Sequence, residues 1–163
     1  MRTQRSLATL ALALILSGAP AIASAGSVYN VYVNQGFRGV GLMPLGGVIP
    51  VVLAGTIPEG LEPAQFTDML RSPGYAPPTR FVPSGTGYDN GTRMVFSFGN
   101  ASPRGLCDEP RSGGASDVIS VAFCTGDTTI SLATLRRGSN LQGDLNQVMR
   151  EIISRPRALG GLI

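Results

Sequence analysis

The clearest alternation of apolar and polar side chains lies in the segment TRMVFSF, which ends at Phe98. Met94, Phe96 and Phe98 occupy every second position, so a strand would place them together on one face of a sheet. Arg93 and Ser97 would lie on the opposite face. An aromatic row of this kind is typical of the core face of a half-buried sheet rather than of a ligand platform.

Two other segments predict buried strands. Residues 117–124 (DVISVAFC) are almost entirely apolar, which is typical of a central position in a sheet. Residues 48–54 (VIPVVLA) have the composition of a buried strand start. Pro50 lacks a backbone N–H, so we expect it at a sheet edge or at the first paired residue.

Three segments carry weaker strand signals. Residues 27–33 (SVYNVYV) are rich in Val and Tyr and are compatible with either a strand or an extended arm. Residues 80–82, within a long connection rich in Pro and Gly, could form a brief strand. Residues 128–135 are compatible with either a strand or a helix.

Residues 139–153 predict a helix. Ser139 and Gln142 have the spacing of a capping box at its start, and Pro156 ends it. Apolar residues recur at helical spacing and form one stripe: Leu141, Leu145, Val148, Met149 and Ile152. This stripe should pack on the sheet. The alternative is a helix that binds a partner or a membrane surface, which its sparse and mixed charges do not favour.

Residues 63–70 predict a second, shorter helix, because Pro63 suits the first helical position. Together these elements indicate a small two-layer α+β domain over residues 48–155. We expect a mostly antiparallel sheet of three to five strands with about two helices on one face. Residues 26–47 would form an extended, Gly-rich N-terminal arm, and residues 156–163 a flexible tail.

The N-terminal segment has the pattern of an export signal. Two arginines precede an apolar run at residues 7–16, and the small-residue sequence ASA ends at Ala25. The run is too short for a membrane-spanning helix, which needs about 20 residues, so an uncleaved anchor is the weaker alternative. Residues 1–25 therefore predict a cleavable signal peptide, with cleavage between Ala25 and Gly26. The mature protein would be periplasmic or secreted, without stable membrane insertion.

Two cysteines, Cys107 and Cys124, are present. In an exported chain an even number of cysteines predicts a disulfide, which would hold the preceding loop against the strand that ends at Cys124. A redox-active pair is the alternative, but such pairs are usually spaced C-x-x-C.

The charge balance gives little support for binding to nucleic acid. All 13 basic residues are arginine, and two of them lie in the predicted signal, which leaves 11 against 10 acidic residues. Only Arg136 and Arg137 are adjacent, so no basic face is indicated. The use of arginine without lysine, together with the short signal, favours a bacterial origin.

Several chemistries are excluded by composition. The chain has no His, Lys or Trp. Without His there is no Ser-His-Asp triad and no imidazole metal site, and without Lys there is no Schiff base and no phosphate-loop lysine. The glycines of residues 36–41 follow the order G-x-x-G-x-G, which is not a dinucleotide-binding fingerprint. We expect no cofactor and no metal ion.

An enzyme of this composition would depend on carboxylates. The candidates in predicted loops are Asp89, Asp108, Glu109 and Asp127. A glycosidase needs two carboxylates placed across a sugar bond, and no spacing here favours such a pair. Solvated loop charges are therefore the simpler interpretation.

The favoured hypothesis is an exported, periplasmic, non-catalytic protein. It would bind an envelope protein or a small ligand through two long Pro/Gly-rich loops, because connections of about 17 residues are longer than usual. One alternative is an envelope-directed hydrolase that uses the loop carboxylates. Another is a structural envelope protein that assembles through residues 35–47. The sequence specifies neither the ligand nor the oligomeric state.

Overall fold

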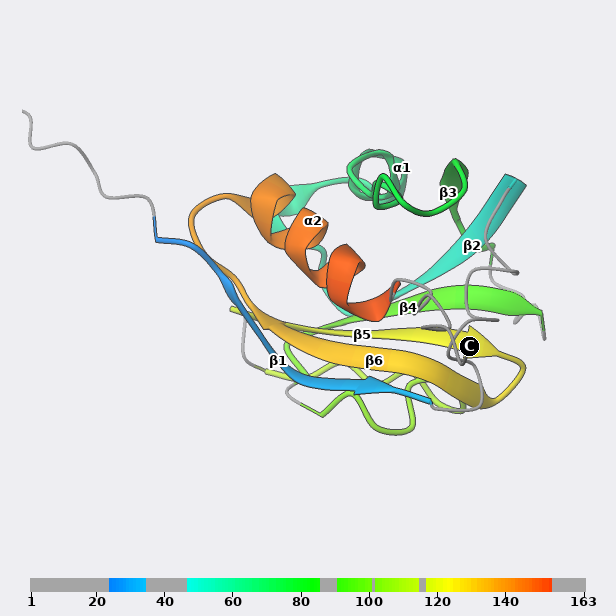
Figure 1. Ribbon diagram of the computed structural model, residues 1–163. Coiled ribbons are helices and arrows are strands. Elements are labelled where there is room, and N and C mark those ends of the chain that lie inside the picture. Colours follow the sequence, from blue (N-terminus) through cyan, green and yellow to red (C-terminus); the bar gives the residue numbers. More distant parts are fainter. Residues whose placement is uncertain (1–23, 35–46, 86–90, 101, 115–116, 154–163) are drawn as a thin grey trace, which may run out of the picture.

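The computed structural model describes residues 24–34, 47–85, 91–100, 102–114 and 117–153. They form an α+β domain with two α-helices and one six-stranded sheet (Figure 1). The strands are β1 (Ser27–Val33), β2 (Gly47–Ala54), β3 (Thr79–Pro83), β4 (Thr92–Phe98), β5 (Val118–Thr125) and β6 (Thr128–Arg136). The helices are α1 (Pro63–Asp68) and α2 (Leu141–Ile152), and a short 3-10 turn spans Pro58–Gly60.

The sheet has more strands than the three to five expected. Its order is β1-β6-β5-β4-β2-β3. The three segments with weak signals, which became β1, β3 and β6, all form strands, and β1 pairs with β6 rather than extending as a free arm. Pairing with neighbours therefore decided the structure where the local pattern was ambiguous.

The expectation of a mostly antiparallel sheet is corrected to a mixed one. β2 runs parallel to both β3 and β4, whereas β4, β5, β6 and β1 pair antiparallel in turn. The chain passes from β2 through α1 to β3, and a crossover with a helix returns the chain in the same direction. Figure 1 shows β2 and β3 rising from the rest of the sheet toward the side of the helices.

Pro50 lies where its missing N–H is tolerated. β2 is interior in the strand order, but Pro50 pairs only with Val82 of β3, and pairing with β4 begins at the next residue, Val51. Within the described residues, Pro50 therefore has no paired residue on the β4 side, which agrees with the expected edge-like position.

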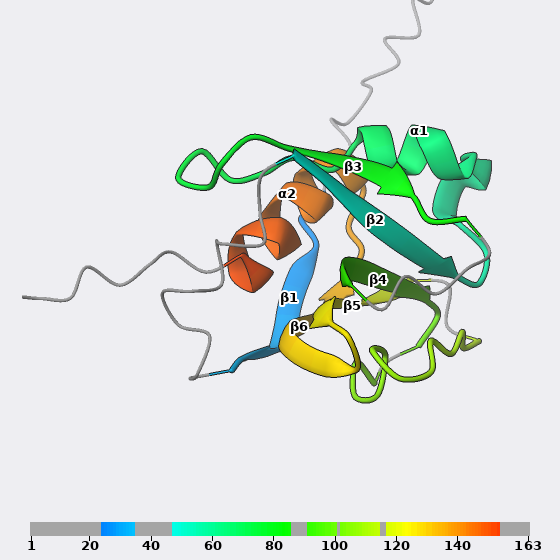
Figure 2. The ribbon, with the colours of Figure 1, turned by 90° about the vertical axis from the view of Figure 1, so that its right-hand side faces the viewer.

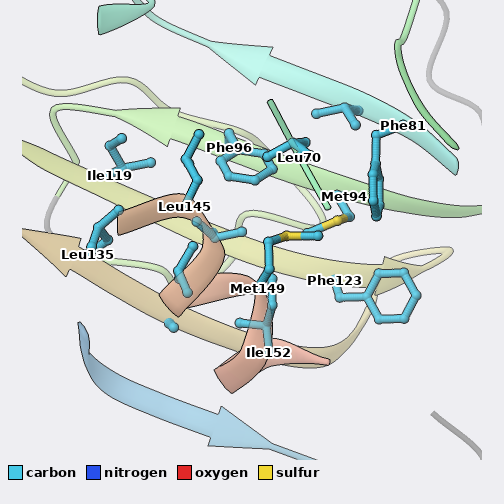
Figure 3. Packing of buried hydrophobic residues seen from close by; sticks show 14 of the residues in the cluster. Leu70, Phe81, Met94, Phe96, Ile119, Phe123, Leu135, Leu145, Met149 and Ile152 are labelled. Atoms are coloured by element: carbon cyan, nitrogen blue, oxygen red, sulfur yellow. The ribbon is translucent and has the colours of Figure 1, made fainter. Parts of the chain in front are cut away.

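Both helices cover one face of the sheet and enclose the main core. Figure 3 shows Leu145, Met149 and Ile152 of α2 beside side chains of the sheet that include Met94 and Phe96. The apolar stripe of α2 is buried in this core, as predicted, and the aromatic row of β4 forms its floor.

The predicted cap of α2 is wrong by one residue. Asn140 is the N-cap, and its side-chain oxygen accepts a hydrogen bond from the Gly143 N–H at 3.0 Å. The Ser139 hydroxyl instead donates to the Ser24 carbonyl at 3.2 Å, and the Gln142 amide donates to the Met69 carbonyl at 2.7 Å. Long-range partners therefore displaced the local capping box.

The opposite face of the sheet is covered by a long loop, so the two-layer expectation omitted a layer. We name residues 99–100 and 102–114 the covering loop; Figures 1 and 2 show it across the sheet from α2. Leu106 and Cys107 of this loop form a second buried cluster with Val95, Ala122 and Cys124. The molecule thus has a helical layer, a sheet and an irregular layer.

Candidate functional site

The covering loop is held to the sheet by polar as well as apolar contacts. The hydroxyl of Ser97 donates to the Arg111 carbonyl, and that of Ser120 donates to the Asn100 carbonyl. Both serines are completely buried, so these bonds satisfy groups that would otherwise destabilise the fold. The loop is therefore a fixed surface.

A disulfide between Cys107 and Cys124 crosses from the middle of this loop to β5, as predicted. The guanidinium of Arg93, whose side chain is also buried, donates to the Cys107 carbonyl. Arg93 therefore belongs to a buried face rather than to a solvated polar face, because the Cys107 carbonyl replaces water as an acceptor for its guanidinium.

The outer side of the covering loop borders a hollow of about 570 Å³, which we name the β1 hollow. It lies between the covering loop and the strands β1 and β6, which come first in the strand order of the sheet. Its lining consists of Asn30, Val31, Tyr32, Ser102, Pro103, Arg104 and Leu132. Val31 is 44 % exposed and Tyr32 is 49 % exposed, although large apolar side chains are more often buried.

The exposure of these two side chains follows from a β-bulge. Tyr29 of β1 is opposite Thr134, whereas Tyr32 is opposite Leu132, so β1 holds one extra residue between the two pairs. Asn30 in this bulge has φ 53°, a left-handed conformation that Asn adopts more readily than most residues. Bulges redirect side chains and occur often beside functional sites. Here the bulge brings Val31 and Tyr32 to the hollow.

A second hollow of about 280 Å³ lies on the same loop and also includes Arg104. Asp108 and Glu109 line it, so the structure brings these two predicted carboxylates together. Glu109 binds Arg111 in an exposed ion pair with an N–O distance of 2.5 Å. The hydrogen bond and the charge of Glu109 raise the pKa of Arg111.

The other predicted carboxylates are not part of this arrangement. Asp127 is exposed in the turn between β5 and β6 and lines neither hollow. Asp89 lies outside the described residues, as do residues 35–46 of the Gly-rich segment. Within the described ranges, no cluster of three or more His, Cys, Asp or Glu side chains could hold a metal ion.

The second long connection is also partly ordered by contacts with the core. It contains β3, and the Tyr75 hydroxyl near its start donates to the Ile153 carbonyl at 2.6 Å. The hydroxyl also lies 3.0 Å from the Arg150 carbonyl. This side chain joins the connection to the C-terminal end of α2.

Sequence reasoning selected loop carboxylates and missed Asn30, Val31, Tyr32 and Arg104. The one available signal was the polar Asn30 within the apolar run SVYNVYV, which interrupts the expected strand pattern. Nothing in the sequence placed Arg104 beside that strand.

Comparisons with models of protein families, with curated proteins and with solved structures found no match to this chain. In the part of the chain that the structure describes, neither helix has the length and apolar character needed to cross a membrane.

Proposed function

We propose that this chain is an exported, non-catalytic binding protein of the bacterial envelope, located in the periplasm. The N-terminal pattern supports export, and a disulfide is typical of an oxidising compartment. The observation that carries the binding function is the bulge of β1, which presents Val31 and Tyr32 beside Arg104 of the covering loop.

The lining of the β1 hollow favours a protein segment as the partner. Tyr32 offers a large apolar surface with a polar hydroxyl, and tyrosine and arginine are enriched among the residues that dominate binding energies. Asn30 can donate and accept hydrogen bonds, and Arg104 can bind a carboxylate. A partner segment with an apolar side chain and a nearby acidic group would complement this surface.

Tyr32 and Arg104 are expected to make central contacts with the partner. Replacement by serine (Tyr32→Ser) or by glutamate (Arg104→Glu) should weaken partner binding about tenfold or more, because each removes a central contact. A photoreactive amino acid at position 32, introduced in the source cells, would first capture and identify the partner. Calorimetry with the purified partner would then measure the effect of each substitution.

The matched control is Val48→Ser. Val48 is a large apolar residue of β2 that is 58 % exposed and does not line the hollow. We expect this variant to bind like the unsubstituted protein, and all three variants to keep its melting temperature within a few degrees, as is usual for surface substitutions. Equal binding by all variants, or capture from position 48 but not 32, would contradict the proposed site.

A further inference from the structure

The carboxylate of Asp144 is buried at the start of α2. Its side chain is 4 % exposed. Oδ1 accepts a hydrogen bond from the Gly26 nitrogen at 2.9 Å, and Oδ2 accepts one from the Gly138 nitrogen at 2.6 Å. One side chain therefore joins the residue before β1 to the connection between β6 and α2.

In the described part of the chain, no arginine side chain forms an ion pair with this carboxylate within 4.0 Å. The ion pairs found there are Arg111 with Glu109 and Arg136 with Asp117, and both lie on the surface. A buried charge is normally accompanied by an opposite charge as well as by hydrogen bonds, because its transfer from water is costly. The surroundings of Asp144 contain the hydrogen bonds but not the charge.

We propose that signal-peptide removal supplies the missing charge, as an ion pair between the new α-ammonium group of Gly26 and Asp144. The proposal rests on the proposed export and on cleavage after Ala25. A signal peptidase hydrolyses the peptide bond between Ala25 and Gly26: water adds its hydroxyl to the Ala25 carbonyl carbon, and the C–N bond breaks. The Gly26 nitrogen keeps the electron pair and is protonated. An α-amine with a pKa of about 7.7–8.0 is mostly an ammonium at neutral pH.

The surroundings of Gly26 admit only a residue without a side chain. A Cβ atom at position 26 would lie 2.4 Å from Oδ1 of Asp144 and 2.8 Å from the Arg136 carbonyl oxygen. A Cβ atom at position 138 would lie 2.4 Å from the Gly26 nitrogen. All three distances are too short for non-bonded atoms, so the two glycines allow the nitrogen to approach the carboxylate closely.

Cleavage also removes two contacts. In the uncleaved chain the Ser24 carbonyl accepts hydrogen bonds from the Ser139 nitrogen at 2.8 Å and from the Ser139 hydroxyl at 3.2 Å. The new ion pair must therefore stabilise the folded chain by more than these two hydrogen bonds do. We expect that it does, because charge-assisted hydrogen bonds in buried sites are stronger than neutral ones.

The absence of lysine makes the pair directly measurable. The α-amine is the sole primary amine of a processed chain without lysine, so an N-hydroxysuccinimide ester labels it alone. We expect the exported, folded protein to be acylated about tenfold more slowly than the same protein in urea, because the paired amine reacts only after deprotonation and local opening.

Asp144→Asn should abolish this protection, since the amide keeps the shape of the side chain but not its charge. Asp117→Asn is the matched control, because Asp117 is a surface carboxylate whose partner is Arg136. It should label as slowly as the unsubstituted protein. Equally fast labelling of the folded and urea-treated unsubstituted protein would overturn the proposal.

A second measurement remains informative if Asp144→Asn does not fold. A chain that keeps Ser24 and Ala25 has an amide instead of an ammonium at Gly26, and we expect it to melt at a lower temperature than the chain starting at Gly26. An equal or higher melting temperature would overturn the ion pair.

The intact mass of the purified protein distinguishes a failure of the proposed ion pair from a failure of the proposed export. A chain that starts at Gly26 but labels freely contradicts only the ion pair. A chain cleaved at another bond also contradicts the pair and leaves export standing, whereas a full-length chain of 163 residues contradicts both.

Discussion

Replacing Phe66 with alanine is expected to lower the free energy of unfolding by about 3–5 kcal/mol, the range for removing a large aromatic side chain from a packed core. Phe66 is completely buried on α1. Its ring makes edge-to-face contacts with Phe96 and Phe98 of β4, with centroid distances of 5.2 and 5.3 Å. Urea unfolding followed by circular dichroism would measure the loss, which corresponds to a fall in Tm of roughly 10–15 °C.

Two variants test whether this loss comes from the aromatic contacts. Phe66→Leu keeps much of the apolar volume but loses the ring contacts, so we expect a smaller loss, roughly 1–2 kcal/mol. Val48→Ala, at an exposed position of β2, should change stability by less than about 0.5 kcal/mol. A loss at Phe66 no larger than at Val48 would show that α1 contributes little to the core.

The substitution Phe66→Ala should also destabilise some strands of the sheet more than others. α1 has only six residues and is too short to be stable alone, so its position depends on packing. Phe66 is its main anchor on β4, and the crossover through α1 places β3 beside β2. Hydrogen exchange should therefore increase first in β2 and β3 and last in β5, which pairs with both β4 and β6 along almost its whole length.

The sequence predicted the elements with complete local patterns. The apolar stripe of α2 is buried as predicted. The alternation of β4 correctly predicted a strand whose apolar row lies in the core, but the opposite face of β4 is buried as well. The disulfide was predicted from the cysteine number and the expected compartment, and it is present. For the strand and the helix, a short segment carried this information by itself.

The sequence could not predict features that depend on distant partners. The sequence of β2 does not indicate that its pairing is parallel, because hydrogen bonding to β3 or β4 does not change the side-chain alternation. Likewise, Arg93 and Ser97 have the pattern of a solvated face. They are buried because a loop that follows β4 presents carbonyl groups to them.

The candidate site was even less accessible from sequence. The β1 hollow joins Asn30, Val31 and Tyr32 to Arg104, more than seventy positions along the chain. Only the order β1-β6-β5 and the path of the covering loop bring these segments together. Paired carboxylates indicate catalytic chemistry, whereas the site consists of apolar, hydroxyl, amide and guanidinium groups.

A single covalent bond, the disulfide, holds the centre of the covering loop to β5. Substitution of both cysteines by alanine should destabilise the protein by about 3 kcal/mol, the loop-closure contribution expected for cysteines 17 positions apart. Alanine avoids placing hydroxyl groups in a site where both cysteines are buried. Urea unfolding, compared with the oxidised unsubstituted protein, would measure the change.

The loss should also be local, because the bridge constrains the covering loop more directly than the helical layer. Trypsin can cut this lysine-free chain only after arginine, and Arg104 and Arg111 lie in the loop, whereas Arg150 lies in α2. Without the disulfide, cleavage at the two loop sites should increase before cleavage at Arg150, since local opening precedes global unfolding. Thr129→Val is the matched control: it removes the hydroxyl that lies 3.3 Å from Cys107 Sγ but keeps the bridge, and it should leave the loop protected. Equal cleavage at Arg104, Arg111 and Arg150 in the double alanine variant would mean that the loop and α2 open together, and that the buried serine contacts, rather than the disulfide, hold the loop on the sheet.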